Sequence, residues 1–246
     1  MVVSSYLIKS ENSSKLASIV SQIATSSSFT YPLLSTINNN CTLVRLKHAA
    51  IPNTLYNIRD GVNNTITLRD YINGTLLIII PPGCYTVFTL LDTLIQLLNA
   101  VGSQTYNVSY NPTTFLISFS AGSVFALDFT ATNSCASVLG FANEITARAT
   151  LITGSKVLKL NTNSIYITID EIPNGIYGSQ SYPYTFMIPL NGNAGSVIQY
   201  DSCSSFSQSV PVYRLPLYSL TIHLYYDNNE LVDLHGADWE MLLEFE

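Results

Sequence analysis

Charged side chains are scarce in this chain. Asp, Glu, Lys and Arg together make up 11% of its 246 residues, whereas about 25% is usual for soluble domains. Ser, Thr, Asn and Tyr must therefore cover much of the surface. Uncharged hydrogen-bonding groups cost less to bury than charges, so such a surface suits lasting contact with other protein better than a freely soluble monomer. The composition favours an assembling protein over a monomeric enzyme.

Basic residues are the scarcer of the two charge types. Ten Lys and Arg stand against 16 Asp and Glu, and no Lys or Arg follows Arg214. A nucleic-acid surface needs clustered cations to neutralise phosphates, so we expect no direct contact with nucleic acid. The acidic end, from Asp227 to Glu246, is compatible both with a basic partner and with a solvated final hairpin.

The cysteines are few and far apart in the sequence. They are Cys41, Cys84, Cys135 and Cys203, and no two of them form a CxxC pair. A zinc site needs close pairs, and a disulfide scaffold needs more cysteines in a shorter chain. We therefore expect reduced, mostly buried thiols. The N-terminal MVVSSYLIKSENSS also lacks the charged start and the longer apolar core of a signal peptide.

Catalytic motifs are absent from the sequence: it has no GxSxG, no HExxH and no phosphate-binding loop. His48 and His223 lie within strand patterns, where a structural role is expected. His235 lies beside Asp233 and Asp238 in VDLHGADWE, and Gly236 indicates a turn there rather than a metal site. We predict no enzymatic activity, no cofactor and no metal. A hydrolase would require two distant carboxylates to converge in one cleft.

Long uninterrupted apolar runs are also missing. The most apolar passage, IIIPPGCYTVFTLLDTLIQLLNAVG, is broken by Pro81 and Pro82, and its single glycine offers no phosphate cradle. After the break, apolar residues recur at helical spacing between a Thr86 N-cap and a Gly102 stop. About 15 residues span roughly 22 Å, too short for a bilayer. We predict an amphipathic helix near 86–101 packed over a sheet, and no membrane span.

Strand patterns dominate the rest of the chain. The clearest is the end, where LYSLTIHLYYD is followed by a DNNE turn and then by the alternation of Trp239, Met241, Leu243 and Phe245 with polar residues. A period of two marks antiparallel strands with one face in a core. The pattern predicts that Trp239 is buried and anchors the core. A dozen or more short strands with little helix predict an all-β fold, a single jelly-roll β-sandwich.

The order of the segments resembles a known family. FTYPL, LKHAAIPNTLYNI, PPGCYTVFTLLDTLIQLLNA, YNVSYNPTTFLISF, SVLGF and LYSLTIHLYYDNNELVDLHGADWEMLLEFE follow one another as in the penton or minor capsid proteins of double-jelly-roll DNA viruses. That group includes virophages, polinton-like elements and giant viruses. The resemblance implies one jelly-roll capsid domain over 1–246 with an N-terminal arm at about 1–27. The part that matches least, about 142–216, is where we place an insertion.

The resemblance also implies a function. Five copies would form a homopentamer at each icosahedral vertex of a virion assembled inside the host cell. The partners would be the trimeric major capsid protein and other minor capsid or spike proteins. The apolar, strand-prone N-terminus is suited to augmenting a neighbouring sheet. We therefore choose Tyr6, Leu7 and Ile8 as candidate interface residues.

Two alternatives remain open at this point. A receptor- or glycan-binding attachment protein would expose a cluster of tyrosines, or would line a groove with Trp239. A minor capsid protein of the same fold would form trimers away from the vertex.

Overall fold

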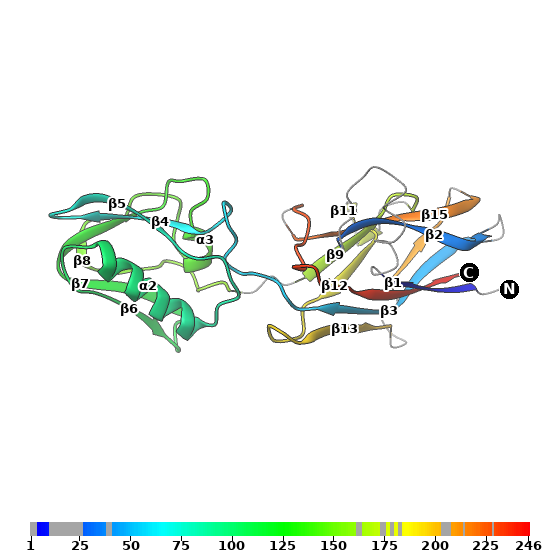
Figure 1. Cartoon of the computed structure of the whole chain (residues 1–246), viewed down its shortest axis with the longest axis horizontal. Coiled ribbons are helices and arrows are strands. Elements are labelled where there is room, and N and C mark those ends of the chain that lie inside the picture. Colours follow the sequence, from blue (N-terminus) through cyan, green and yellow to red (C-terminus); the bar gives the residue numbers. More distant parts are fainter. Residues whose placement is uncertain are drawn as a thin grey trace. The chain divides into compact units, whose positions relative to one another are not determined.

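The chain is built from two compact units. The computed structural model describes residues 4–9, 27–37, 41–160, 164–172, 176–177, 180–181, 184–202, 208–213, 215–227 and 229–246. Unit 1 comprises Met1–Leu55 and Thr162–Glu246, and unit 2 comprises Tyr56–Asn161. Both are made mainly of antiparallel strands (Figure 1).

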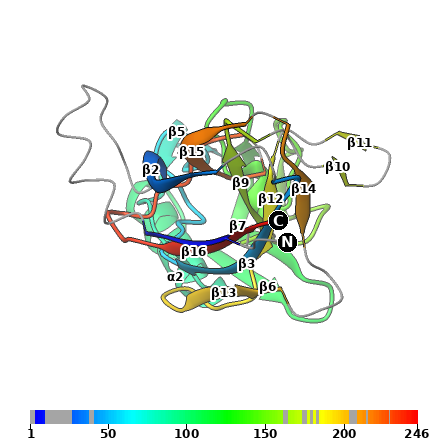
Figure 2. The same cartoon turned by 90° about the vertical axis from the view of Figure 1, so that its right-hand side faces the viewer.

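Unit 1 is a sandwich of two sheets. The first sheet has the order β1 (Ser4–Lys9), β16 (Glu240–Phe245), β3 (Leu43–Pro52) and β13 (Val197–Asp201), and β14 (Ser209–Pro211) also pairs with β3. The second has the order β12 (Phe186–Pro189), β9 (Ser164–Ile169), β15 (Leu217–Tyr225) and β2 (Ser28–Ile37). A short pair, β10 (Ile176–Tyr177) and β11 (Gln180–Ser181), stands apart from both. The two sheets face each other in Figure 2, and this all-β jelly roll confirms the predicted fold class.

Alternating side chains fill the space between these sheets. In β16, Met241, Leu243 and Phe245 are at most 2% exposed, and the residues between them point outward. In β15, Leu220 and Ile222 are fully buried in the same core. The alternation read from the sequence is therefore the alternation between core and surface.

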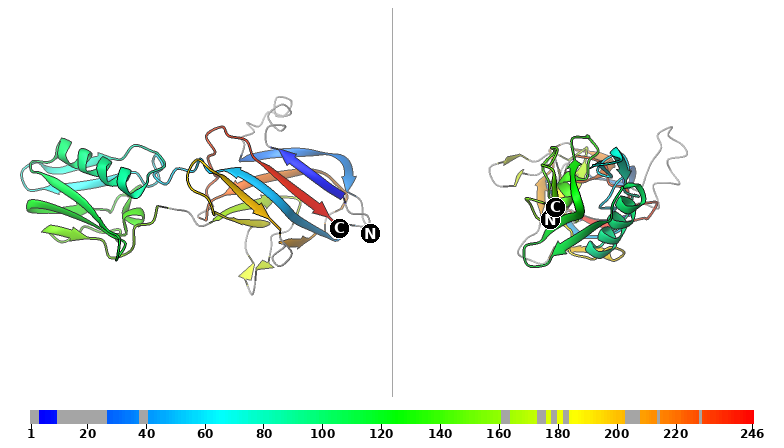
Figure 3. Two further views of the ribbon diagram at one scale, coloured as in Figure 1. Left: turned by 90° about the horizontal axis from the view of Figure 1, so that it is seen from below. Right: turned by 90° about the vertical axis from the view of Figure 1, so that its left-hand side faces the viewer.

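Unit 2 is one sheet with a helix against it. Its strands are β5 (Gly74–Ile79), β4 (Thr65–Asp70), β7 (Leu116–Asp128) and β6 (Tyr106–Asn111) in that order, with β8 (Ala149–Thr153) also paired to β7. Its helices are α2 (Val87–Val101) and the short α3 (Ala136–Leu139). Figure 3 shows α2 lying against one face of the sheet. Leu90, Leu94 and Leu98 of α2 are fully buried in this unit's own core, as the helical periodicity predicts.

Both ends of α2 are fixed by local interactions. The Thr89 amide donates to Thr86 Oγ1 at 3.2 Å, and the Thr86 amide donates to Thr89 Oγ1 at 2.9 Å. The two residues therefore form a capping box that satisfies amide donors lacking an intrahelical partner. At the other end, the Gly102 amide bonds the Leu98 carbonyl at 2.9 Å. A Cβ on Gly102 would lie 2.3 Å from the Tyr106 ring, so glycine is needed there.

Removing the N-cap side chain should weaken unit 2. We expect Thr86→Ala to lower the free energy of unfolding by about 1 kcal/mol, because the Thr89 amide loses its acceptor. Thermal unfolding followed by circular dichroism measures the change. Thr93→Ala is the matched control, because it removes the same groups from the middle of α2. An equal loss for both variants would contradict a capping effect.

The structure divides the chain differently from the sequence prediction. One domain over 1–246 with an insertion within 142–216 was expected, whereas the second unit is Tyr56–Asn161, between β3 and β9. Within 142–216, β9, β12, β13 and β14 belong to the jelly roll. The physical reason is that strand periodicity is the same in both units. It identifies a strand but does not tell which core that strand joins.

Candidate functional site

Ion pairs gather on the outer face of the first sheet. They are Lys9–Glu240 at 3.0 Å, Arg45–Glu246 at 3.1 Å and Lys47–Glu244 at 3.4 Å, and beside them the His48 ring forms a 2.7 Å hydrogen bond with Asp201. β3 and β16 direct alternate residues inward, and the charged residues occupy the positions between them. Each pair is partly exposed, so each adds little to stability. Their effect is to neutralise most of the charge on this face within the chain itself.

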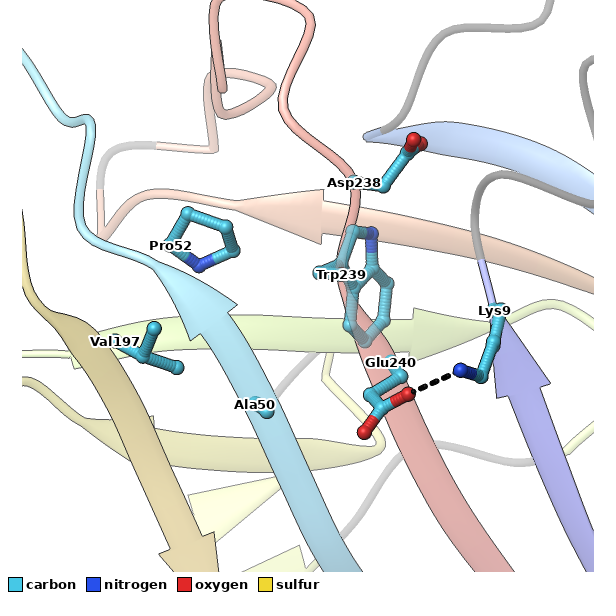
Figure 4. Close-up of a pocket in the computed structure, with 7 residues that line it drawn as sticks. All are labelled: Lys9, Ala50, Pro52, Val197, Asp238, Trp239 and Glu240. Carbon is cyan, nitrogen blue, oxygen red and sulfur yellow. Dashed lines mark ion pairs between the residues drawn. The ribbon is translucent and has the colours of Figure 1, made fainter.

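A shallow depression lies on the same face (Figure 4). Its volume is about 240 Å³, and it is lined by Lys9, Ala50, Pro52, Val197, Asp238, Trp239 and Glu240. Sites for drug-sized molecules usually enclose about 300–1,000 Å³. The depression is therefore small for such a ligand and better matched to a single side chain.

Trp239 forms part of this depression but is a core residue. It lies one residue before β16 and is 4% exposed. Its ring meets Phe29 edge to face, with centroids 6.0 Å apart and planes at 62°. An aromatic platform for a sugar needs an open ring face, which a 4% exposed indole does not offer. The burial that the alternation predicts is found, and its contribution to stability stays a prediction.

The candidate interface residues Tyr6, Leu7 and Ile8 lie in β1, at the edge of the chain's own first sheet. β1 pairs with β16, with Tyr6 opposite Leu243. Ile8 is 1% exposed and belongs to the core, and the Tyr6 ring meets Phe245 at 5.7 Å. Leu7 is 49% exposed. The sequence did not indicate this core role, because a terminal strand shows the same apolar pattern whether it joins its own sheet or that of a neighbouring subunit.

The structure describes only part of the predicted N-terminal arm. Residues 1–3 and 10–26 of the arm at about 1–27 lie outside the described residues. Whether Tyr6, Leu7 and Ile8 contact another subunit stays a prediction.

The four strands of the second sheet contain no Asp, Glu, Lys or Arg, and its carboxylates, Asp170 and Glu171, directly follow β9 and contact β15. Tyr166 of β9 stacks on Tyr184 with centroids 4.2 Å apart, and Tyr225 of β15 lies 6.5 Å from Tyr184. The Tyr184 hydroxyl donates to Asn229, and burial raises the pKa of Tyr184. These rings cover one another's faces, so they make a packed cluster rather than an open stacking surface. The two sheets of the jelly roll therefore differ in chemistry.

A buried carboxylate in unit 2 was missed by the sequence reasoning. Asp70 is 2% exposed and accepts five hydrogen bonds. The donors are the amides of Ile72, Asn73 and Ser103, at 2.7, 2.9 and 2.9 Å, and the hydroxyls of Ser103 and Tyr106, both at 2.6 Å. The Ile72 and Asn73 amides belong to the β4–β5 turn, Ser103 follows the end of α2, and Tyr106 is the first residue of β6. Asp70 thus ties three elements together.

The electrostatics of this cluster follow from those contacts. Burial alone would raise the pKa of Asp70, but the hydrogen bonds from Ser103, Tyr106 and Asn73 outweigh it and hold the pKa well below its ordinary value. Burial and the Asp70 carboxylate raise the pKa of Tyr106 to about 12. Every donor is provided by the chain itself, so the cluster is structural. The only signal in the sequence is an Asp before the YING turn.

The structure groups no metal ligands among the residues it describes. His235 lies in a turn with a φ of 52°, as the sequence predicts, and its ring lies 3.4 Å from Asp233. Of the cysteines, Cys135 is buried and Cys84 is exposed, so the expectation of mostly buried thiols does not hold for Cys84. Cys203 lies outside the described residues.

No helix among the described residues is long and apolar enough to cross a bilayer.

The architecture itself defines a class of protein. It is a jelly roll whose chain carries a second β-sheet unit between two of its strands. No protein-family model and no curated protein matches the sequence. Among solved structures, the chain is similar to the crystal structure of the selenomethionine-labelled mavirus penton protein. The match has a TM-score of 0.53 and 12% identity, and it covers 100% of this chain and 99% of that one. The chain has a penton-like fold.

Proposed function

We propose that the chain is a structural protein of a viral capsid, and that it is the penton. Five copies would close each icosahedral vertex in a ring and contact the trimeric major capsid protein around it. One observation carries the proposal: the likeness to a penton protein extends over both chains almost from end to end. A shared domain alone would leave much of one chain unmatched.

The surface chemistry supports an assembling protein. Charged residues are 11% of the chain, and three ion pairs neutralise most of those on the first sheet. A face of this kind is covered by another subunit without leaving unpaired charges behind. The unlike outer faces of the two sheets suit a head-to-tail ring, in which each subunit uses two different surfaces.

The proposal is tested by the mass of the native assembly. We expect native mass spectrometry over a range of concentrations to show a species of five 27.0 kDa chains. A trimer would move the protein away from the vertex and contradict the penton proposal. A chain that stays monomeric at every concentration, also with the major capsid protein present, would contradict a ring as well.

The N-terminal strand provides a variant for the same measurement. In the proposed ring β1 contacts the neighbouring subunit through Leu7, which is 49% exposed, whereas Ile8 is 1% exposed. Leu7→Glu should therefore reduce pentamer formation and leave the melting temperature unchanged. Ile8→Ala, its matched control, should lower the melting temperature. Full pentamer formation by Leu7→Glu would show that β1 is not part of the interface.

A further inference from the structure

Among the residues that the structure describes, strands β5, β6 and β8 of unit 2 each pair with another strand on one side only, and Asn99 of α2 covers part of the β6 edge by bonding the Tyr106 backbone, so β5 and β8 are the open edges. In the described residues 41–160, the backbone hydrogen bonds of β5 run to β4 and those of β8 run to β7. Their outer edges therefore present free N–H and C=O groups. Natural proteins usually protect such edges with charged residues, proline or bulges. Neither β5 nor β8 contains a charged residue or a proline, although Arg148 directly precedes β8 and the β7–β8 pairing shifts register between Ser120 and Phe125.

These edges lie on opposite sides of one sheet. Asp128 of β7 pairs with Thr67 of β4 and also with Ile145. Phe119, earlier in β7, pairs with β6 and also with Ile152 of β8. A strand residue has one neighbour on each side, so the segment from Ile145 through β8 follows one side of β7. β4 lies on the other side, with β5 beyond it.

Both edges expose large apolar side chains, and they do so on the same face of the sheet. Leu77 and Ile79 of β5 are 59% and 56% exposed, and Leu151 of β8 is 60% exposed. Their neighbours Ile78 and Ile152 point the opposite way, into the core of unit 2. If the two edges met, these three exposed residues would lie side by side as cross-strand neighbours.

The direction of the strands also fits a ring. β5, β4, β7 and β8 are antiparallel in succession. Consequently β5 of one subunit is antiparallel to β8 of a second subunit rotated about an axis along the strands. This contact is head to tail, because each copy uses one edge of each kind, and such contacts close into rings. Pairing β5 with a second β5 would instead give a two-fold dimer.

Charge does not oppose the contact. No charged residue occurs between Tyr71 and Leu91, which includes all of β5, and none occurs in β8. Bringing the edges together therefore removes no ionised group of either strand from water. Strands of six and five residues bury far less than the roughly 1,600 Å² of a standard interface. The strand pair must then be one part of a larger contact between copies, which unit 1 provides in the proposed pentamer.

From these observations we infer that β5 of one subunit pairs antiparallel with β8 of the next copy of this chain, so that the sheets of unit 2 form a continuous band around the ring. The inference rests on the proposed function, since it gives the pentamer a second contact. The β5 edge of each subunit therefore binds the β8 edge of a second copy of the chain.

Cysteine cross-linking tests the pairing directly. The parent chain carries Cys84→Ser, because Cys84 is exposed, and it reports the background from the remaining thiols. Adding Leu77→Cys together with Leu151→Cys should give disulfide-linked chains up to pentamers under mild oxidation, and Ile79→Cys with Leu151→Cys covers a shifted register. Each single substitution should give no linked species above the background.

The outcomes separate this inference from the proposed function. Dimers formed by Leu77→Cys alone would show two-fold pairing of β5 and overturn the inference. A pentamer by native mass in which neither double variant becomes linked would overturn the strand pairing and leave the penton proposal intact. Absence of a pentamer from both the unmodified chain and the Cys84→Ser parent would count against the strand pairing and the penton proposal alike.

A charge on the edge gives a second readout. Leu77→Lys should raise the concentration needed for half-assembly about tenfold or more, because a Lys on an edge strand hinders pairing with another strand. Phe88→Lys is the matched control: Phe88 is 76% exposed in the same uncharged stretch, but it lies on α2 and not on an edge strand. Equal effects of the two variants would contradict an edge contact.

Discussion

Replacing Asp70 with Asn should lower the free energy of unfolding of unit 2 by about 3 kcal/mol, since hydrogen bonds to a charged group contribute about 1.5–3 kcal/mol each. The carboxylate accepts five hydrogen bonds. The amide of Asn has one acceptor oxygen only. In either orientation its NH₂ group would face a backbone amide, of Ser103 or of the β4–β5 turn. Two hydrogen-bond donors would then point at each other. The buried donors would lose their partner, with little room for water at a 2% exposed site.

Two controls isolate this effect. Asp92→Asn makes the same chemical change at an exposed site on α2 and should stay within about 0.5 kcal/mol of the parent. Tyr106→Phe removes one of the five hydrogen bonds and should cost less than Asp70→Asn. Hydrogen exchange of the α2 amides measures unit 2 specifically. Equal protection in Asp70→Asn and Asp92→Asn would contradict the proposed role of Asp70.

The same residue should make unit 2 sensitive to acid. The pKa of Asp70 is lowered in the folded state, so its contribution to stability is fully present above the unfolded value of about 3.9. It is lost as the pH falls through the lower folded value. In Asp70→Asn the loss of stability below about pH 4 should be shallower. An unchanged acid profile would indicate that other carboxylates, such as Asp128 with its pKa lowered to about 2, dominate.

Replacing Trp239 with Ala should lower the free energy of unfolding of unit 1 by about 3–5 kcal/mol. The indole is 4% exposed and packs against Phe29 between the two sheets. Its removal leaves a cavity beside the depression that Trp239 lines, and few side chains are free to collapse into it. Trp239→Phe retains much of the volume and should cost clearly less.

Unfolding of Trp239→Ala must be followed without tryptophan fluorescence, because the substitution removes the fluorescent residue. Trp239 is the one tryptophan of the chain, so its fluorescence reports unit 1 in the parent and in every unit 2 variant. For Trp239→Ala, hydrogen exchange of the β15 and β16 amides takes its place. Tyr213→Ala is a suitable control, because this aromatic residue of unit 1 is 76% exposed. A melting temperature unchanged by Trp239→Ala would contradict the placement of this residue in the core.

Local patterns were read correctly from the sequence wherever the interactions themselves are local. The helix near 86–101 has the predicted Thr86 cap and Gly102 stop, because a capping box and a 3.6-residue stripe involve neighbours in sequence. The alternation that ends in Phe245 predicts the inward face of β16 for a similar reason. The fold class follows from the number and shortness of such strands.

Features that depend on distant partners were not accessible in this way. Asp70 bonds Ser103 and Tyr106, 33 and 36 residues away, and a carboxylate before a turn looks the same with or without them. Ile8 becomes a core residue only because β1 joins β16 near the other end of the chain.

The division into two units is the clearest case. β4 and β9 show the same burial pattern, yet one belongs to unit 2 and the other to the jelly roll. By itself, the sequence determined where the strands and α2 form, which of their faces are apolar, and that the surface is poor in charge. The tertiary structure decided which strands share a core, which carboxylate is buried and which edges stay open. Those properties depend on pairings between residues far apart in the chain, and a strand's side-chain pattern does not specify its partner.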